Sequence, residues 1–181
     1  MELKLLNSAS QDQLEEIGQL RTLVWTGESD VNPHSLGPQP WIDPVDQSAY
    51  QWTIKDHGRL VAAARLTVHS DLDSIPYQAA FRDRLPKSKI VGAMNRLVVL
   101  PDYRGQGLAR QLDCLRLHHA PKIGAALVVV VASGQRVLAL ESLGFENLGE
   151  PNQTPELLRT RQPYSILIHR LREIPSLPEQ G

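Results

Sequence analysis

The sequence lacks the features of disulfide-bonded, zinc-binding and membrane-spanning proteins. Cys114 is the only cysteine among 181 residues, so no disulfide can form within the chain, and a cysteine-based zinc site would lack ligands. No apolar run approaches the roughly 18 residues that a membrane helix needs. Residues 1–4 do not begin the basic-then-apolar order of a signal peptide. These absences predict a cytoplasmic protein with no metal and no membrane partner.

An excess of either charge is also missing. The formal net charge is −1, and the basic residues are scattered without a block of like charge. Nucleic acids are bound largely through lysine and arginine contacts to phosphates, so no nucleic-acid partner is expected. Hydrophobic residues make up 41% of the chain and charged residues 22%, as is ordinary for a globular protein.

Periodicity and turn residues predict strands and helices within one domain. Ser10 and Gln13 have the spacing of a capping box, and apolar residues follow at helical intervals to residue 24. The Asp56-His57-Gly58 turn separates strand-like residues 50–55 and 59–69, which predicts a hairpin with a three-residue loop. Residues 126–131 are apolar and β-branched, as in a buried strand. Further strands are expected at residues 2–6, 89–100, 145–148 and 164–171, and further helices at residues 77–85, 108–121 and 133–143.

The expected domain comprises residues 1–172. Two prolines near the end predict a loose tail over residues 173–181. Residues 27–44 are rich in glycine, proline and aspartate, which predicts a long loop. Ser133 is expected to cap the helix that follows it, and Cys114 to be a small core residue.

The chemically informative stretch is residues 101–107 (PDYRGQG), which lie between a strand and a helix. The first N–H groups of a helix have no partner within it, and together with the helix dipole they bind anions such as phosphate. Gly105 and Gly107 lack side chains, so phosphate oxygens can approach the backbone. Arg104 and Arg110 add positive charge at the rim. The stretch therefore predicts a site for a pyrophosphate.

Other phosphate motifs fit this stretch less well. A P-loop requires Lys and then Ser or Thr after its last glycine, where this chain has Leu108 and Ala109. A dinucleotide fingerprint requires Gly or Ala at the position of Arg110, and it usually opens a fold. A plain glycine-rich turn that begins a helix remains the simplest alternative.

The pattern Arg-x-x-Gly-x-Ala, carried by Arg104, Gly107 and Ala109, resembles the coenzyme A (CoA) motif of the GNAT family, the GCN5-related N-acetyltransferases. The downstream Leu143-Gly144-Phe145 resembles the tripeptide that closes the family's next helix. The resemblance implies an α/β (α+β) domain with the acyl-CoA N-acyltransferase fold. Its mixed, mostly antiparallel sheet has six to seven strands, splays near the middle and carries helices on both faces.

The resemblance also implies acetyl-CoA as acyl donor, with no metal. The backbone of Leu97, Val98 and Val99 would contact the pantetheine arm. An N–H near Val99 would stabilise the oxyanion of the tetrahedral intermediate, an effect often worth roughly 3–4 kcal/mol. Beside the matched Arg104, the residues implied to hold the pyrophosphate are Gly105, Gln106, Gly107, Leu108, Ala109 and Arg110.

The chain departs from the family at the acid–base positions. Many members carry a glutamate where this chain has Met94-Asn95-Arg96, and a tyrosine where it has Leu140. Water held by Asn95 or by a backbone carbonyl can take the proton of the amine, and CoA can leave as a thiolate without a proton donor. Alternatively another group serves, or the protein binds acyl-CoA without turnover. The candidates for another group are His69, Asp71, Asp73 and Tyr164.

The implied activity is transfer of acetyl to a primary amine of a small molecule or a protein. An acyl-CoA sensor and an acyl-homoserine-lactone-synthase-like transferase are the alternatives. Trp41 is the candidate acceptor contact, and Asp43, Asp46 and residues 150–161 complete the expected specificity region. Dimers are common in the family, so a homodimer is compatible with the resemblance.

Overall fold

The computed structural model describes residues 1–29, 31, 39–81, 84–86, 89–151 and 163–171. Within these residues, seven strands form one sheet in the order β1-β2-β3-β4-β5-β7-β6. β4 and β5 are parallel, and the other neighbours are antiparallel. The strands are β1 (Glu2–Leu6), β2 (Tyr50–Asp56), β3 (Arg59–His69), β4 (Val91–Val99), β5 (Leu127–Ser133), β6 (Glu146–Gly149) and β7 (Tyr164–Arg170). This architecture confirms the expected mostly antiparallel sheet and the acyl-CoA N-acyltransferase fold.

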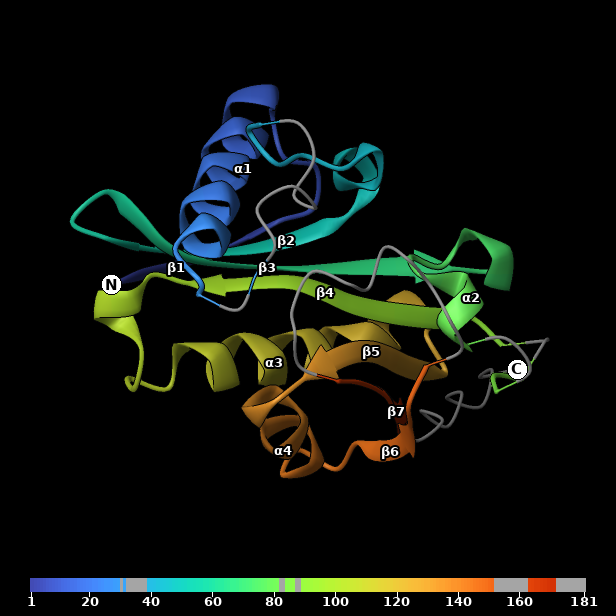
Figure 1. The fold of residues 1–181 in the computed structure, drawn as a ribbon. Coiled ribbons are helices and arrows are strands. Elements are labelled where there is room, and N and C mark those ends of the chain that lie inside the picture. The colour runs from blue at the N-terminus through green and yellow to red at the C-terminus, as the bar shows by residue number, and fades with distance from the viewer. Residues whose placement is uncertain (30, 32–38, 82–83, 87–88, 152–162, 172–181) are drawn as a thin grey trace, which may run out of the picture.

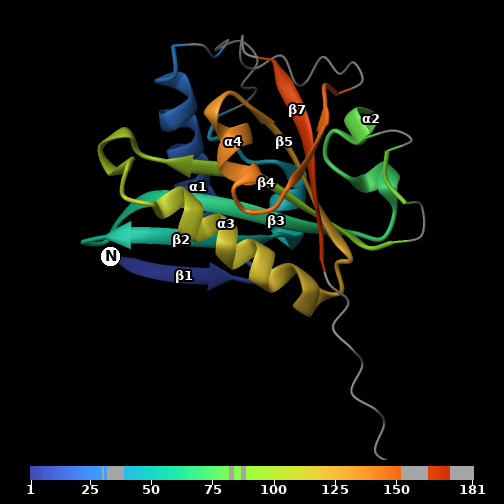
Figure 2. The same ribbon diagram turned by 90° about the horizontal axis from the view of Figure 1, so that it is seen from below.

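Helices cover both faces of the sheet, as expected. The helices are α1 (Gln11–Thr26), α2 (Gln78–Phe81), α3 (Leu108–His119) and α4 (Gln135–Glu141). α1 lies on one side of β3 and β4, and α3 lies on the other (Figure 1). In the view of Figure 2, β7 runs across the direction of β1 and β2, which shows how strongly the sheet twists. No described helix has the length and apolar character needed to span a bilayer.

Local sequence signals account for several element boundaries. The Ser10–Gln13 capping box is present, with both reciprocal bonds made. The hairpin loop between β2 and β3 has two residues, not the expected three, because His57 (φ 46°) and Gly58 (φ 82°) both adopt the left-handed conformation of a tight hairpin turn. The expected helix at residues 77–85 is shorter, since α2 ends at Phe81.

Two smaller predictions are wrong. Ser133 ends β5, and the residue that precedes α4 is Gly134, whose φ of 56° lets the chain turn from strand to helix. Cys114 is exposed, because it lies on the opposite side of α3 from the buried Leu108 and Leu112. The predicted tail at residues 173–181 lies outside the described residues, and the boundary at residue 172 stays a prediction.

The sheet opens between β4 and β5. Register pairs join them only at Val91–Leu127, Gly92–Val128 and Ala93–Val129. Beyond these pairs, β4 continues to Val99 and β5 to Ser133 without pairing to each other. The register of β4 against β3 also shifts between the Ala63–Val98 and Arg65–Asn95 pairs, and Arg96 within this bulge has a φ of 52°. Bulges re-aim side chains and bend strands, so this one helps to separate β4 from β5.

Candidate functional site

A cavity of about 630 Å³ lies where β4 and β5 separate. Its described lining comes from both strands, from the last turn of α1, from α3 and α4, and from Glu28, Val31, Trp41, Tyr77, Arg104 and Tyr164. The structure therefore brings part of the expected site together in one place. The predicted residues that line the cavity are Trp41, Asn95, Leu97, Val98, Val99, Arg104 and Ala109, whereas Gly105, Gln106, Gly107, Leu108 and Arg110 lie outside it in the adjoining loop and helix.

The loop before α3 leaves its backbone accessible. Gly105 (φ 75°) and Gly107 (φ 78°) are exposed and left-handed, a conformation that L side chains rarely adopt. A Cβ at either position would meet nothing within 4 Å. The N–H of Gln111 is the first to bond back within α3, to the Gly107 oxygen at 2.9 Å. The amides of residues 108–110 precede that bond and lie at the positive end of the helix, as an anion site requires.

The two arginines of this loop region make contacts within the chain. Arg104 forms an ion pair with Glu28, which follows α1, and its Nε donates to the Val99 oxygen at 3.4 Å. Arg110 donates from Nη1 to the Ser142 hydroxyl at 3.0 Å. Arg104 therefore joins the loop, the end of β4 and the end of α1 at the mouth of the cavity.

The end of β4 directs backbone groups into the gap. The Leu100 N–H donates to the Val61 oxygen of β3 at 2.9 Å. Successive residues of a strand point their N–H and C=O groups to opposite sides, so those of Val99 face away from β3. On that side β5 makes no register pair with this part of β4. Val99 consequently presents an N–H and a carbonyl oxygen to the cavity.

The candidate acid–base groups are widely separated. Asn95 lines the cavity, but its Oδ1 accepts from Arg65 Nε at 2.6 Å. His69 is buried and lies outside the cavity, with its ring nitrogens 2.7 Å from the Thr67 hydroxyl and 3.0 Å from the Ser74 hydroxyl. Burial lowers the pKa of His69, and the positive charge of Arg65 lowers it further.

The acidic residues near His69 have a local role. Asp71 accepts from the Asp73 N–H at 3.0 Å and caps a short 3₁₀ helix. Tyr164 lines the cavity, and Leu140 is fully buried elsewhere in the core. Among the candidates other than Asn95, Tyr164 is the one that the fold places at the cavity.

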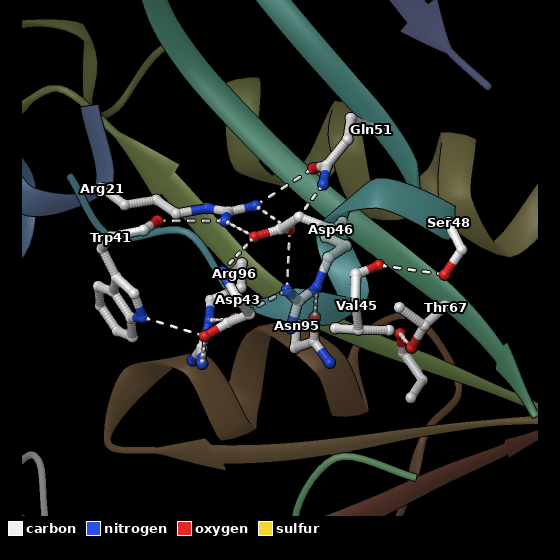
Figure 3. A network of polar contacts seen from close by, with 12 residues as sticks. Arg21, Trp41, Asp43, Val45, Asp46, Ser48, Gln51, Thr67, Asn95 and Arg96 are labelled. Atoms are coloured by element: carbon white, nitrogen blue, oxygen red, sulfur yellow. Dashed lines mark hydrogen bonds and ion pairs between the residues drawn. The ribbon is translucent and has the colours of Figure 1, made fainter. Parts of the chain in front are cut away.

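Behind the wall of the cavity that contains Trp41 lies a chain of ion pairs that the sequence reasoning missed. Asp46 is 0% exposed and accepts from Arg21 Nη1 at 2.7 Å and Arg65 Nη1 at 2.8 Å. Asp43 accepts from Arg65 Nη1 at 2.7 Å and Arg96 Nε at 2.6 Å. Figure 3 shows Asp46 between Arg21 and Gln51, and the Trp41 indole nitrogen directed at Asp43. We call these residues (Arg21, Asp43, Asp46, Arg65, Arg96) the arginine network.

The network keeps its carboxylates ionised. Burial alone would raise the pKa of Asp46, but the hydrogen bonds and charges of Arg21 and Arg65 outweigh it and lower that pKa to about 2. The pKa of Asp43 is likewise lowered against the effect of burial, by Arg96 and Arg65. The sequence held one signal of this network, because Arg21 follows Ile17 by four residues within the apolar stripe of α1.

A second ionic cluster supports the base of the gap. Asp113 of α3 is buried and accepts from Arg116 Nη2 at 2.5 Å and from both terminal nitrogens of Arg136 at 2.6 Å. Arg116 also donates from Nη1 to the main-chain oxygens of Arg65 and Asn95, at 3.0 and 3.3 Å. Both arginines line the cavity. The described residues hold no group of three or more His, Cys, Asp or Glu placed to bind a metal ion.

The open sheet with an anion-ready loop at its gap is the architecture of acyl-CoA N-acyltransferases. The sequence pattern described as the acetyltransferase (GNAT) family matches residues 14–145, and this chain belongs to that family. The family carries out acyl transfer, which establishes the general reaction class. A search of curated proteins found no match.

Several solved structures share the fold. An acyl-CoA N-acyltransferase from Pseudomonas aeruginosa is 20% identical, with a TM-score of 0.65 over 93% of this chain and 98% of that one. ElaA from Escherichia coli is 21% identical, with a TM-score of 0.63 over 93% and 99% of the two chains. YncA from Salmonella typhimurium, solved with its cofactor acetyl-CoA, is 14% identical, with a TM-score of 0.63 over all of both chains. At these identities the likeness concerns the fold.

Proposed function

We propose that this protein transfers an acetyl group from acetyl-CoA to a primary amine of a small molecule or a protein. The observation that carries the proposal is the continuity between the first amides of α3 (residues 108–110), which precede its first backbone bond, and the gap at β4. A long donor with a diphosphate at one end and a reactive group at the other fits this path. The acyl transfer chemistry of the family supports the reaction class.

The residues present fit CoA. Gly105, Gln106, Gly107, Leu108, Ala109 and Arg110 would hold the pyrophosphate, and a side chain at either glycine would fill the space that phosphate oxygens need. Arg104, which pairs with Glu28 at the mouth of the cavity, would border the same group. Leu97, Val98 and Val99 would position the pantetheine arm along β4. When bound, the coenzyme supplies an activated acyl group as a thioester.

The chain's own groups would orient the acceptor and stabilise charge. The Val99 N–H, which faces the gap, would donate to the oxygen that gains negative charge, an effect often worth roughly 3–4 kcal/mol. The attacking amine must lose a proton, and water held by the Asn95 amide or by a backbone carbonyl would receive it. Tyr164 is the alternative proton carrier at the cavity. Trp41 would form part of the acceptor wall.

Calorimetry with acetyl-CoA tests the proposal directly, and Gly107→Glu tests the phosphate site. A glutamate at residue 107 would place a carboxylate beside the bound phosphates, so binding should be lost. Gly149→Glu on β6 is the matched control, since Gly149 is also left-handed (φ 84°) and a Cβ there would meet nothing within 4 Å. Unchanged affinity in Gly107→Glu would refute the assigned site, and absent binding in the parent protein would refute the function.

A second candidate is an acyl-CoA sensor without turnover. It is favoured by one observation: the carboxylate in the described lining, Glu28, is paired with Arg104, and the Asn95 oxygen is bound to Arg65. Acetyl-CoA binding without transfer to any member of a broad amine panel would select the sensor. Comparing acyl-CoA with acyl-carrier-protein donors tests the homoserine-lactone-synthase-like alternative. The cytoplasmic location and the homodimer stay predictions.

A further inference from the structure

The charged groups around the cavity are mostly cationic. The described lining contains the guanidinium groups of Arg96, Arg104, Arg116 and Arg136, and one carboxylate, that of Glu28. Arg104 neutralises Glu28 at the mouth. The arginine network behind the wall has three guanidinium groups (Arg21, Arg65, Arg96) and two carboxylates (Asp43, Asp46), which leaves one positive charge unbalanced. An uncompensated buried charge is costly, so the network favours an anion at its exposed end.

Arg96 is the member of the network that lines the cavity. Its backbone is left-handed within the β4 bulge, at a φ of 52°. Its guanidinium lies 4.3 Å from the centre of the Trp41 ring, close enough for a cation–π contact. It donates from Nε and Nη2 to Asp43, at 2.6 and 3.1 Å, and from Nη1 to the Tyr77 hydroxyl at 2.9 Å. The side chain is thus held in one orientation from three sides.

These contacts leave part of the guanidinium available. A guanidinium carries five N–H groups, and the bonds to Asp43 and Tyr77 use one each on Nε, Nη1 and Nη2. One N–H on each terminal nitrogen remains for a ligand, among the contacts of the described residues. Burial opposes the charge of Arg96, but Tyr77 and Asp43 raise its pKa, so it stays cationic. Free N–H groups on a fixed cationic plane suit the oxygens of a carboxylate.

We propose that the acceptor is a small amino acid whose carboxylate binds Arg96 and whose side chain is apolar. This inference rests on the proposed function and names its substrate class. The cavity of about 630 Å³ must hold the end of the donor together with the acceptor, and this size suits a small molecule. The wall beside Arg96 is formed by Trp41 with Val31 and Trp25, a surface that suits an aliphatic or aromatic side chain.

The same charge pattern assists the chemistry. Nearby cations disfavour a protonated amine and lower its pKa. An amino acid held by its carboxylate at Arg96 would therefore carry its amino group in a positive environment, where a larger fraction is neutral and able to attack. This reduces the need for a carboxylate base, in agreement with the described lining, where Glu28 is already paired.

The test compares acceptors that differ only at the carboxylate. Transfer from acetyl-CoA is measured by mass spectrometry for leucine, leucine amide and isopentylamine, and for phenylalanine, its amide and phenethylamine. Charge-assisted hydrogen bonds predict a kcat/KM about 10- to 100-fold higher for the amino acids. In Arg96→Lys, which keeps the charge but loses the planar pair of donors, the ratio of amino acid to amide should fall toward one. Arg170→Gln, an exposed arginine at the far end of β7, should leave the ratio unchanged.

A binding readout makes the result independent of turnover. Trp41 lies against Arg96, so titration of the CoA-bound protein with each of the twenty amino acids should change its tryptophan fluorescence saturably for the apolar ones and not for their amides. Equal kcat/KM for amino acids, amides and amines would overturn the inference while acetyl transfer stands. The inference would also be overturned if the protein transferred acetyl to no amino acid and gave no fluorescence response. Failure of acetyl-CoA to bind in calorimetry would instead refute the proposed function.

Discussion

At the scale of single residues, Asp46 shows how the fold depends on a buried charge. It is 0% exposed and balances Arg21 and Arg65, which are each 1% exposed. Removing one member of a buried ionic cluster leaves the others uncompensated, which costs far more than losing a surface pair. The residue was expected at the acceptor site, but the structure places it in the buried arginine network and outside the described cavity lining.

Asp46→Ala should lower the free energy of unfolding by about 3–5 kcal/mol, because the buried Arg21 loses its carboxylate and the buried Arg65 keeps only Asp43. Urea denaturation measures the change. Glu16→Ala is the control, since Glu16 pairs with Lys55 at 2.7 Å on the surface and should change stability by less than about 1 kcal/mol. Similar small effects for both variants would show that the network contributes little.

The same residue predicts a dependence of stability on pH. The folded pKa of Asp46, about 2, lies below the roughly 3.9 of an unfolded aspartate. The stabilisation is therefore complete above pH 4 and is lost as the pH falls from 4 to 2, by about 2 kcal/mol. Denaturation of the parent protein and of Asp46→Asn across this range measures it. If Asp46→Asn lost stability as steeply as the parent protein between pH 4 and 2, groups other than Asp46 would cause the loss.

At the scale of elements, the approach of α1 to residues 40–42 positions Trp41 at the cavity. The Trp41 N–H donates to the Gly18 oxygen at 3.3 Å. A Cβ at Gly18 would lie 2.8 Å from Ile42 Cγ1, 3.1 Å from Pro40 Cβ and 3.2 Å from the Trp41 oxygen. Glycine within α1 therefore allows a close contact that any other residue would disturb.

Gly18→Ala should lower the free energy of unfolding by about 1–2 kcal/mol, because the steric conflict outweighs the higher helix propensity of alanine. It should also raise the KM for the acceptor by displacing Trp41, while the Kd for acetyl-CoA stays unchanged. Gly27→Ala at the end of α1 is the matched control, with its nearest contacts at an ordinary 3.5 Å. Equal acceptor KM values in the two variants would contradict the role assigned to the contact.

Local signals allowed most elements to be predicted. The capping box, the His57–Gly58 turn and the β-branched run of β5 act over a few residues, so the sequence shows them directly. In the sequence, Arg96 stands out only because the family's glutamate is missing from its stretch. Its role depends on a bulge against β3 and on contacts with Asp43, 53 positions away, and neither follows from local spacing. The distant arginine partners were missed for the same reason.

At the scale of the whole molecule, the sheet consists of two parts, β1–β4 and β5–β7, that share three register pairs. A donor bound in the gap would contact both parts. Acetyl-CoA at about 100 times its Kd should add about 2.7 kcal/mol to the free energy of unfolding. For a chain of this length that raises Tm by roughly 5–10 °C.

Hydrogen exchange locates this effect. Acetyl-CoA should slow exchange at the amides of residue 99 and residues 108–110, which face the gap or begin α3. Gly107→Glu, which should not bind, gives the baseline, and Gly149→Glu should respond as the parent protein does. Protection confined to the strands remote from the gap, such as β1 and β2, would argue that the donor binds elsewhere.

Arg116 holds the bulge in β4 from the α3 side. It is 1% exposed, and burial lowers its pKa to about 10 against the opposing effect of Asp113, so it remains a cation at neutral pH. Its two bonds to main-chain oxygens of β3 and β4 are made within the chain itself and require no ligand. The gap between β4 and β5 is consequently preorganised, because the two strands already stand apart before the coenzyme binds. Association of the coenzyme should follow single-step kinetics, without the concentration-independent slow phase that a closed sheet would impose.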